Sequence, residues 1–466
     1  MGFRTKRSKL PSAYLKKKGY ESVSVNFTVG MVSLGCPKNQ MDAELMLAKL
    51  QAAGIPIKAD AALADVVIIN TCGFIADAKQ ESIEQILEFA QLKKEGQIKK
   101  ILVTGCMAQR YQQEVADELP ECDGVIGLGA NDDIVETVKR VMQGDRVTAF
   151  PDTACWSLDG DRVQTTPSFF AYLRIADGCN NCCTYCAIPH IRGKFRSRTI
   201  ESIVAEATTL AENGVRELVL VAQDTTMYGI DLYGEVRLPQ LLRELCKIEK
   251  LHWIRMLYCY PERITEELLD TMAAEPKLVK YLDMPIQHAS GAVLRAMNRP
   301  GNAETLSALM THIREKLPGV VLRTTVMVGF PGETDEDIET LCAFLNTAQF
   351  ERLGCFAYSA EEGTVAGEMN NQIPEKIKEK RRDIVMDRQT ERMDRYEQSL
   401  VGRTLEVLVE SFDRYAECWF GRTAGDAPDI DCKVFFTTPV RVQPGDFVQV
   451  TVTDTMDADL VGEVIV

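Results

Sequence analysis

The sequence contains no apolar run of about 18 residues, the length that a membrane-spanning helix requires. Residues 1–20 are basic but lack the apolar core of a secretory signal peptide. Positive charge is also scarce overall, since 53 Lys and Arg residues stand against 68 Asp and Glu residues and the formal net charge is −15. These absences predict a cytoplasmic protein that has no membrane partner, repels phosphate backbones and attracts basic partners.

At 466 residues, the chain is long enough for about three domains. Its 45% hydrophobic and 26% charged residues are typical of a globular protein and exclude an intrinsically disordered one. Changes of pattern along the chain predict five parts. They are a basic, disordered extension (1–24), an α/β domain (25–150), a linker (151–168), a second α/β domain (169–400) and a small β domain (401–466).

The first α/β domain is predicted to be an open parallel sheet. Its short apolar runs are typical of buried strands, and they cover Val29–Leu34, Val66–Ile69 and Ile101–Thr104. Each run is followed by a stretch with helical periodicity, for example Ala43–Ala53 or Glu81–Leu92. Strands that alternate with helices in this way favour parallel pairing.

The second α/β domain contains six further strand-like runs that alternate with helical stretches. They are Tyr172–Ala176, Leu218–Ala222, Ile254–Cys259, Tyr281–Ile286, Val320–Val328 and Gly354–Tyr358. Six units are too few for a complete eight-unit barrel, so we predict a partial (β/α)6 TIM-like barrel with its site at the carboxyl ends of the strands. The last part alternates apolar and polar residues, which predicts a small antiparallel β-barrel.

The chain has 15 cysteines, an odd number that disfavours a secreted disulfide framework and favours metal binding. Cys179, Cys183 and Cys186 follow the first barrel strand with the spacing C-x3-C-x2-C. Three thiolates in a tight loop can bind three irons of a [4Fe–4S] cluster and leave the fourth iron open. The alternatives are a zinc loop, with Cys182 or His190 as fourth ligand, and a group of buried thiols without metal.

A second set of cysteines follows three buried strands of the first domain. Cys36, Cys72 and Cys106 each come directly after a predicted strand and stand beside Gly or Thr. The carboxyl ends of neighbouring parallel strands lie close in space, so these thiols are predicted to bind a second [4Fe–4S] cluster with one open iron. The alternative is that a small residue is simply favoured in a tight turn after a strand.

The Cys179–Cys186 motif, with aromatic Tyr185 before its last cysteine, resembles the radical S-adenosylmethionine (SAM) superfamily. The resemblance implies that the open iron binds SAM and that reductive cleavage releases a 5′-deoxyadenosyl radical. It also implies that Tyr185 lies near the adenine and that the segment from Gly329 to Gly332 contacts SAM, although an ordinary βα turn explains these glycines too. Gln223, after the second barrel strand, is a candidate contact to SAM or substrate, or a loop cap.

The two predicted clusters and the three domains together resemble the methylthiotransferases. The resemblance implies that SAM supplies both the radical and a methyl group, that the cluster on Cys36, Cys72 and Cys106 handles the sulfur, and that a low-potential flavodoxin or ferredoxin donates electrons. Iron in such a cluster is a soft metal that can hold the sulfur, and a radical can react with a carbon that is otherwise inert. No catalytic residue beyond the cluster ligands is assigned.

Members of this family modify either a tRNA adenosine or an aspartate of a small-subunit ribosomal protein. Residues 401–466 hold 12 acidic and five basic residues, and this charge disfavours nucleic acid as substrate. Asp426, Asp429 and Asp431 are expected to attract a basic ribosomal protein. The segments Val221–Tyr233 and Gly421–Asp431 also resemble the branch that converts an aspartate of small-subunit ribosomal protein number twelve to 3-methylthio-aspartate.

Two rival functions stay open at this point. The first is a tRNA adenosine methylthiotransferase, which would need a basic surface elsewhere in the fold. The second is a zinc-binding ribosome-assembly or RNA-binding factor without catalysis, which would contain zinc and no iron.

Overall fold

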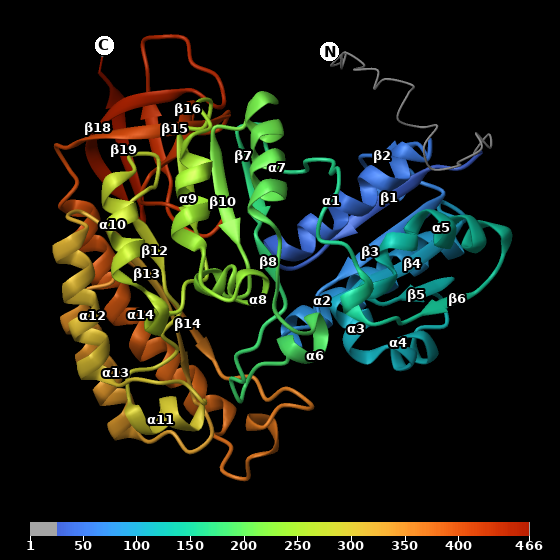
Figure 1. The fold of residues 1–466 in the computed structure, drawn as a ribbon, viewed down its shortest axis with the longest axis horizontal. Helices are drawn as coiled ribbons and strands as arrows, with labels where there is room; N and C mark the ends of the chain where they lie inside the picture. Colours follow the sequence, from blue (N-terminus) through green and yellow to red (C-terminus); the bar gives the residue numbers. More distant parts are fainter. Residues whose placement is uncertain (1–25, 466) are drawn as a thin grey trace. The chain divides into compact units, whose positions relative to one another are not determined.

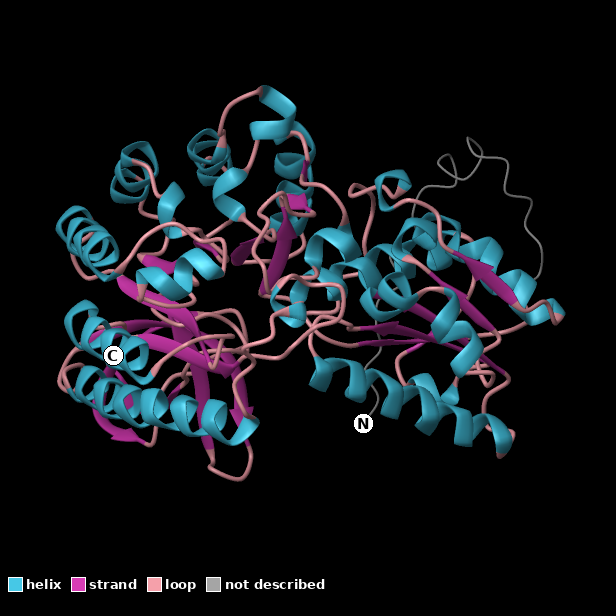
Figure 2. Cartoon of the chain, turned by 90° about the horizontal axis from the view of Figure 1, so that it is seen from below, coloured by secondary structure: helices cyan, strands magenta, loops and turns pink. Residues whose placement is uncertain are grey.

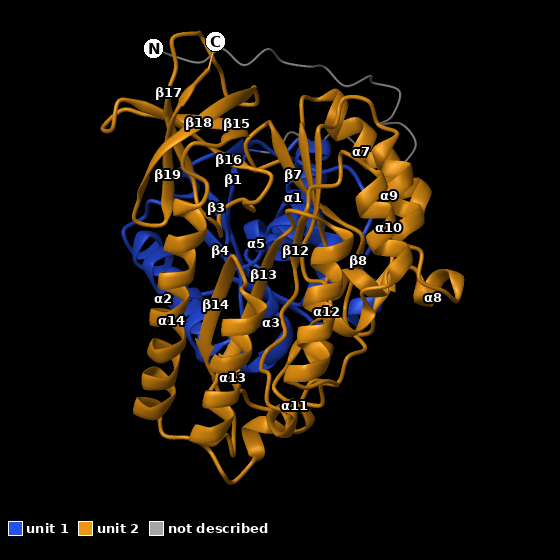
Figure 3. Ribbon diagram, turned by 90° about the vertical axis from the view of Figure 1, so that its left-hand side faces the viewer, with its two compact units in different colours: residues 1–163 blue, residues 164–466 orange. Residues whose placement is uncertain are grey.

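The computed structural model describes residues 26–465, so the extension predicted for residues 1–24 lies outside the described range. The chain divides into two compact units, the first ending at Val163 and the second beginning at Gln164 (Figure 3). Among residues 26–465, no helix combines the length and the apolar character that a bilayer crossing requires.

The first unit is built on a six-stranded parallel sheet with the order β2-β1-β3-β4-β5-β6 (Figure 1). The strands are β1 (Val29–Ser33), β2 (Ile57–Lys58), β3 (Val66–Thr71), β4 (Lys100–Gly105), β5 (Gly124–Ile126) and β6 (Val147–Ala149). The helices are α1 (Pro37–Ala52), α2 (Ala76–Lys94), α3 (Cys106–Tyr111), α4 (Gln113–Glu118) and α5 (Ile134–Gln143). The three strands predicted from apolar runs are β1, β3 and β4.

Helices cover both faces of this sheet (Figure 2). Successive side chains of a strand point to opposite faces, so alternate residues of β3 belong to two different cores. Val66 and Ile68 pack in the core formed with α1 and α5. Val67 and Ile69 pack in the core formed with α2, α3 and α4. Burial on both faces explains why the strands are continuous apolar runs in the sequence.

The second unit begins with six parallel strands that form two three-stranded sheets, ordered β11-β10-β7 and β12-β13-β14. The strands are β7 (Phe170–Arg174), β10 (Glu217–Val221), β11 (Trp253–Met256), β12 (Tyr281–Asp283), β13 (Val321–Val328) and β14 (Arg352–Ala357). A hydrogen bond from Cys259 N to Asp283 O (2.9 Å) joins the two sheets just after β11. The six strands confirm the predicted partial barrel.

Helices line the outer side of these strands (Figure 2). The long ones are α7 (Ile200–Glu212), α9 (Leu238–Cys246), α10 (Glu266–Ala274), α12 (Ala303–Lys316), α13 (Asp335–Ala348) and α14 (Glu375–Gln398). Shorter elements in the loops are β8 (Ala176–Asp177), β9 (Arg196–Ser197), α6 (Ile188–Arg192), α8 (Ile230–Tyr233), α11 (Gly291–Ala296) and the 3₁₀ helices η5 (Thr225–Met227) and η6 (Pro261–Arg263).

The C-terminal part is a closed five-stranded barrel with the order β15-β16-β17-β19-β18. Its strands are β15 (Thr404–Asp413), β16 (Cys418–Thr423), β17 (Val434–Thr437), β18 (Phe447–Met456) and β19 (Asp459–Val464). The prediction of an antiparallel barrel was wrong for one pair, because β17 and β19 run parallel. Alternation of apolar and polar residues determines which face a side chain occupies, but it carries no information on the direction of the neighbouring strand.

The acidic residues expected to attract a basic partner contact the partial barrel instead. Asp426 accepts a hydrogen bond from Arg352 at 2.8 Å and is almost completely buried. Asp431 accepts one from the hydroxyl of Tyr281 at 2.6 Å. This expectation was therefore wrong for Asp426 and Asp431, since the charge of each is used inside the second unit.

Asp429 is more exposed than its two neighbours, but it also contacts the barrel. Its carboxylate accepts a hydrogen bond from the hydroxyl of Tyr172 in β7 at 3.3 Å. Arg323 of β13 reaches the same loop, with its Nε 3.6 Å from Asp431 Oδ1. The loop between β16 and β17 thus contacts four strands of the partial barrel, β7, β12, β13 and β14.

Candidate active site and cluster-binding loops

The loop with Cys179, Cys183 and Cys186 follows β8. Cys179 and Cys183 are buried and Cys186 is half-buried. The loop is fixed by backbone hydrogen bonds from Cys179 N to Gly193 O (3.1 Å) and from Thr184 N to Met297 O (3.1 Å). Gly178 has φ +77°, and a Cβ there would lie 2.1 Å from the carbonyl oxygen of Lys194, so only glycine fits.

The spacing of the thiols bears on the choice between zinc and a cluster. Among the described residues, no three Cys, His, Asp or Glu side chains converge closely enough to hold a single metal ion. A mononuclear zinc site needs such convergence, whereas each thiolate of a cubane binds its own iron at a separate corner. Burial raises the pKa of the Cys179 thiol to about 11, so metal binding must displace its proton.

Two residues of the loop after β11 reach the cysteine loop, and the sequence analysis did not identify them. The hydroxyl of Tyr260 lies 3.7 Å from Cys183 Sγ. Arg263 donates to Asn181 Oδ1 (2.8 Å) and to Asp224 Oδ2 (2.6 Å). Asn181 is part of the cysteine loop, so this network fixes the loop from a strand more than seventy residues away in the chain.

Asp224 is the cap of a short helix. Its Oδ1 accepts hydrogen bonds from the backbone N–H of Thr226 (3.1 Å) and from its hydroxyl (2.5 Å), at the start of η5. Burial raises the pKa of Asp224, although its hydrogen bonds oppose this. Its role is to hold the loops around the cysteines in place.

Tyr185 and the segment from Gly329 to Gly332 are brought together. Tyr185 packs against an apolar cluster that includes Met297, Phe330 and Tyr358. Phe330 lies within the glycine segment, so both predicted SAM contacts border the same apolar cluster. Burial raises the pKa of the Tyr185 hydroxyl well above its usual value, so the ring carries no charge.

The glycines of this segment have structural reasons of their own. Gly329 has φ +76°, and a Cβ there would lie 2.3 Å from Cγ of Lys378 in α14. Gly332 has φ +81°, and a Cβ there would lie 2.3 Å from Nδ2 of Asn371. The N–H of Gly329 also donates to Glu333 at 2.8 Å. Close packing of the chain itself therefore requires both glycines, whether or not a ligand binds beside them.

Gln223 has one polar atom to offer to a ligand. Its Nε2 donates to Asp177 Oδ1 at 2.7 Å. Burial alone would raise the pKa of Asp177, but the charges of Arg192 and Arg174 hold it below its usual range. Asp177 is thus an ionised acceptor, which fixes the orientation of the amide. The carbonyl oxygen of Gln223 is buried and has no hydrogen-bond partner among the described residues.

The other three predicted ligands lie on neighbouring strand ends of the first unit. Strand β1 pairs with β3 and β3 with β4. Cys72 and Cys106 follow β3 and β4 directly, and Cys36 comes three residues after the end of β1. A Cβ on Gly35, which has φ +84°, would lie 2.8 Å from Cys72 Sγ. The loop that carries Cys36 is therefore in direct contact with Cys72.

A buried asparagine links the three loops, and no sequence pattern identified it. The Nδ2 of Asn39 donates to the carbonyl oxygens of Leu34 (2.7 Å), Asn70 (3.2 Å) and Thr71 (3.2 Å). Its Oδ1 lies 3.9 Å from Cys106 Sγ. Asn39 thus fixes the ends of β1 and β3 and also contacts the cysteine that follows β4.

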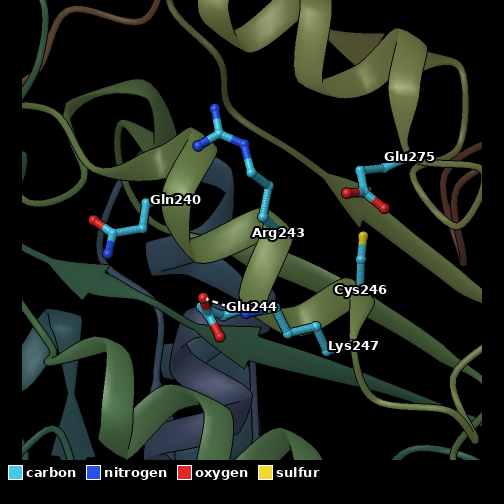
Figure 4. A pocket seen from close by; sticks show the side chains of 6 residues that line it. All are labelled: Gln240, Arg243, Glu244, Cys246, Lys247 and Glu275. Carbon is cyan, nitrogen blue, oxygen red and sulfur yellow. Dashed lines mark hydrogen bonds and ion pairs between the residues drawn. The ribbon is translucent and has the colours of Figure 1, made fainter.

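Two pockets of the second unit lie away from all predicted site residues. One, of about 340 Å³, is lined by Gln240, Arg243, Glu244, Cys246, Lys247 and Glu275 on α9 and next to α10 (Figure 4). The other, of about 480 Å³, lies where Phe447 of the C-terminal barrel meets Arg216 and His252. Neither contains a cysteine of the two predicted ligand sets.

Comparison with known families matches three parts of the chain. Residues 28–127 match the uncharacterized protein family UPF0004, residues 173–345 the radical SAM superfamily, and residues 401–465 the TRAM domain. The radical SAM match implies SAM and a [4Fe–4S] cluster. The predicted radical SAM barrel and small C-terminal β-barrel are thereby confirmed.

The fold is also similar to solved structures. The radical SAM methyltransferase TsrM from Kitasatospora setae matches with a TM-score of 0.55 and 14% identity, over 73% of this chain and 77% of TsrM. The cobalamin-dependent SAM radical enzyme OxsB matches with a TM-score of 0.50 and 11% identity, over 78% of this chain and 56% of OxsB. At these identities the similarity concerns the fold alone.

Much closer relatives are called ribosomal protein uS12 methylthiotransferase RimO. The protein of Desulforamulus reducens is 48% identical over 94% of this chain and 99% of its own length. That of Caldanaerobacter subterraneus subsp. tengcongensis is 48% identical over 93% and 99%, and that of Clostridioides difficile 45% over 94% and 98%. The chain therefore belongs to the RimO family of radical SAM methylthiotransferases.

Proposed function

We propose that this enzyme transfers a methylthio group to the β-carbon of an aspartate in ribosomal protein uS12 and so forms 3-methylthio-aspartate. The observation that carries the proposal is identity of 45–48% to uS12 methylthiotransferases over at least 93% of the chain. The net charge of −15 supports it, because an acidic enzyme attracts a basic ribosomal protein and repels tRNA.

Cys179, Cys183 and Cys186 are proposed to hold the cluster that binds SAM. Three thiols in one short loop, two of them buried and one half-buried, fit a cubane with one open iron. When bound, the cluster supplies the electron that cleaves SAM, and the resulting 5′-deoxyadenosyl radical can remove a hydrogen atom from an inert carbon. We assign the supply of that electron to a low-potential flavodoxin or ferredoxin.

Residues of the second unit are proposed to position SAM. The carbonyl oxygen of Gln223 offers a buried acceptor at the end of β10 for an N–H or O–H of the ligand. Tyr185 offers an uncharged ring beside the apolar cluster at Phe330, which suits a flat adenine. Arg263 and Asp224 hold the cysteine loop, so that SAM meets a rigid site.

Cys36, Cys72 and Cys106 are proposed to hold a second [4Fe–4S] cluster. Support comes from the three adjacent strand ends and from the contact between the Gly35 backbone and Cys72. Such a cluster supplies soft iron that holds the sulfur to be transferred. Asn39 keeps the ends of β1 and β3 together, which keeps the loops of Cys36 and Cys72 in place.

The test uses anaerobically reconstituted protein with SAM, a reductant and either uS12 or tRNA. We expect mass spectrometry to find a methylthio increment on one aspartate of uS12 and none on tRNA. An increment on tRNA alone would make the enzyme a tRNA adenosine methylthiotransferase. Colourless protein that contains zinc and no iron would instead favour the non-catalytic ribosome-assembly factor.

A second test separates the two clusters. Iron and sulfide are counted in the wild type and in a variant with Cys36, Cys72 and Cys106 all changed to Ala. We expect the counts to fall by half in the variant, and SAM cleavage to persist while methylthio transfer is lost. Equal counts in the two proteins would contradict the second cluster.

A further inference from the structure

We infer that Arg299 and Tyr260 form a stacked pair that raises the reduction potential of the cluster on Cys179, Cys183 and Cys186. The inference rests on the proposed cluster and assigns a positioning role to two residues that do not bind iron. Both come from loops outside the cysteine motif: Tyr260 precedes η6, and Arg299 follows α11.

The first step of the argument is contact with a ligand. The hydroxyl of Tyr260 lies 3.7 Å from Cys183 Sγ. A thiolate has no hydrogen to donate, so the tyrosine O–H must be the donor once Cys183 binds iron. Hydrogen bonds to cluster sulfurs stabilise the more negative, reduced state and so raise the potential.

The second step is a buried positive charge behind the tyrosine. The guanidinium carbon of Arg299 lies 4.1 Å from the centre of the Tyr260 ring, a typical cation–π geometry. Arg299 is only 5% exposed. A guanidinium keeps its charge at every relevant pH, so this site carries a permanent cation next to the tyrosine that contacts Cys183.

The third step is that this charge is only partly compensated. The nearest carboxylate oxygen, of Glu262, lies 3.5 Å from NH2 of Arg299. Its Nε and NH1 are buried and have no hydrogen-bond partner among the described residues. The guanidinium carbon of Arg263 also lies near the Tyr260 ring, 5.2 Å from its centre, but Arg263 forms a 2.6 Å ion pair with Asp224. Of the two arginines that stack on Tyr260, Arg299 is therefore the one whose charge is less compensated.

These three observations have one electrostatic consequence. The three thiolates bring negative charge, and one-electron reduction of the cluster adds one more. A buried cation interacts with that added charge more strongly than it would in water, because the surroundings screen it less. Arg299 should therefore stabilise the reduced cluster more than the oxidised one.

The test is an EPR-monitored redox titration in the full-length protein with Cys36, Cys72 and Cys106 changed to Ala, so that only one cluster contributes. We expect Arg299→Gln to shift the reduction equilibrium at least tenfold toward the oxidised state, which is a fall of about 59 mV for a one-electron couple. Arg299→Lys, which keeps the charge, should restore most of the potential. Tyr260→Phe should lower it by a smaller amount, because it loses only the O–H donor.

Arg243→Gln is the matched control, since Arg243 is 43% exposed and lies on the outer helix α9. Its potential should equal that of the parent protein. The inference is overturned if Arg299→Gln binds iron normally and titrates like this control. If Arg299→Gln fails to bind iron, the other two variants decide. An unchanged potential in Tyr260→Phe overturns the inference, and so does a potential in Arg299→Lys that lies about 59 mV or more below that of the parent protein. A parent protein with no iron–sulfur signal would overturn the proposed cluster itself.

Discussion

Arg422 of the C-terminal barrel forms a fully buried ion pair with Glu217 at the first position of β10, with 2.7 Å between the guanidinium nitrogen and the carboxylate oxygen. The other carboxylate oxygen accepts from Arg255 of β11 at 2.9 Å. Burial alone would raise the pKa of Glu217, but the charges of Arg422 and Arg255 hold it below its usual range. The TRAM domain is thus joined to the partial barrel by a carboxylate shared between two arginines.

We predict that Glu217→Gln destabilises the second unit by about 3–5 kcal/mol, because it takes a carboxylate away from two buried guanidinium groups, of which only Arg422 keeps another, that of Glu410. Arg422→Met should cost less, because Glu217 keeps Arg255 as its partner. The measurement is the free energy of unfolding from denaturant titrations of the full-length chain.

An exposed ion pair provides the control for this prediction. Glu244 lies 2.7 Å from Lys247, and both side chains face solvent. Glu244→Gln should change the free energy of unfolding by less than about 1 kcal/mol. A similar loss in Glu217→Gln and Glu244→Gln would show that the buried network contributes little.

Much of the fold was predictable because burial leaves a local trace. Strands β3, β7, β10, β11 and β12 are buried at every position, so side chains on both of their faces are mostly apolar and leave a signal in the sequence. The cysteine loop was predictable because all three thiols lie within eight residues. Cys36, Cys72 and Cys106 could be grouped because topology brings the ends of adjacent parallel strands together.

The rest could not be predicted because it depends on pairs that are distant in the chain. Asp426 was expected to attract a basic partner, yet its charge is taken up by Arg352, 74 residues away. Nothing in a local pattern shows which charges of an acidic segment are buried. Tyr260 reaches Cys183 and Arg299 stacks on Tyr260, both from loops after other strands, so no spacing rule connects them to the cysteine motif. The same is true of Asn39, whose partners belong to two strands.

We predict that Gly35→Ala selectively impairs the site of Cys36, Cys72 and Cys106. The new Cβ would lie 2.8 Å from both Cβ and Sγ of Cys72, which must then move. Iron counting after anaerobic reconstitution should show the loss of one cluster, with the other retained. A normal iron content would contradict the close contact between this loop and Cys72.

Gly54→Ala is the matched control for Gly35→Ala. Gly54 has φ +76°, similar to the φ +84° of Gly35, but a Cβ there meets nothing within 4 Å. Both variants should therefore lose about 1 kcal/mol through backbone strain. Only Gly35→Ala should lose iron, so the comparison separates strain from displacement of the thiol.

We predict that Gln223→Leu weakens SAM binding about tenfold or more, which is about 1.4 kcal/mol, because the ligand loses a buried acceptor. The measurement is equilibrium dialysis of SAM against anaerobically reconstituted protein. Gln240→Leu on α9 serves as the control, since Gln240 lines the outer pocket. An unchanged Kd for SAM together with a raised KM for uS12 would assign the oxygen of Gln223 to the protein substrate instead.

We predict that Asp123 stabilises the first unit at neutral pH and not in acid. Its carboxylate accepts from Lys100 (2.8 Å), Lys93 and the N–H of Ile101 (2.9 Å). Burial opposes them, but these donors hold the pKa of Asp123 below its usual value of 3.8. The folded state then binds the proton less readily than the unfolded state, so the stabilisation is present above that value and is lost as the pH falls below it.

Asp123→Asn should cost about 1 kcal/mol at pH 7, because solvent screens part of the interaction. The difference in unfolding free energy between wild type and variant should shrink below about pH 4, and a constant difference would contradict the assignment.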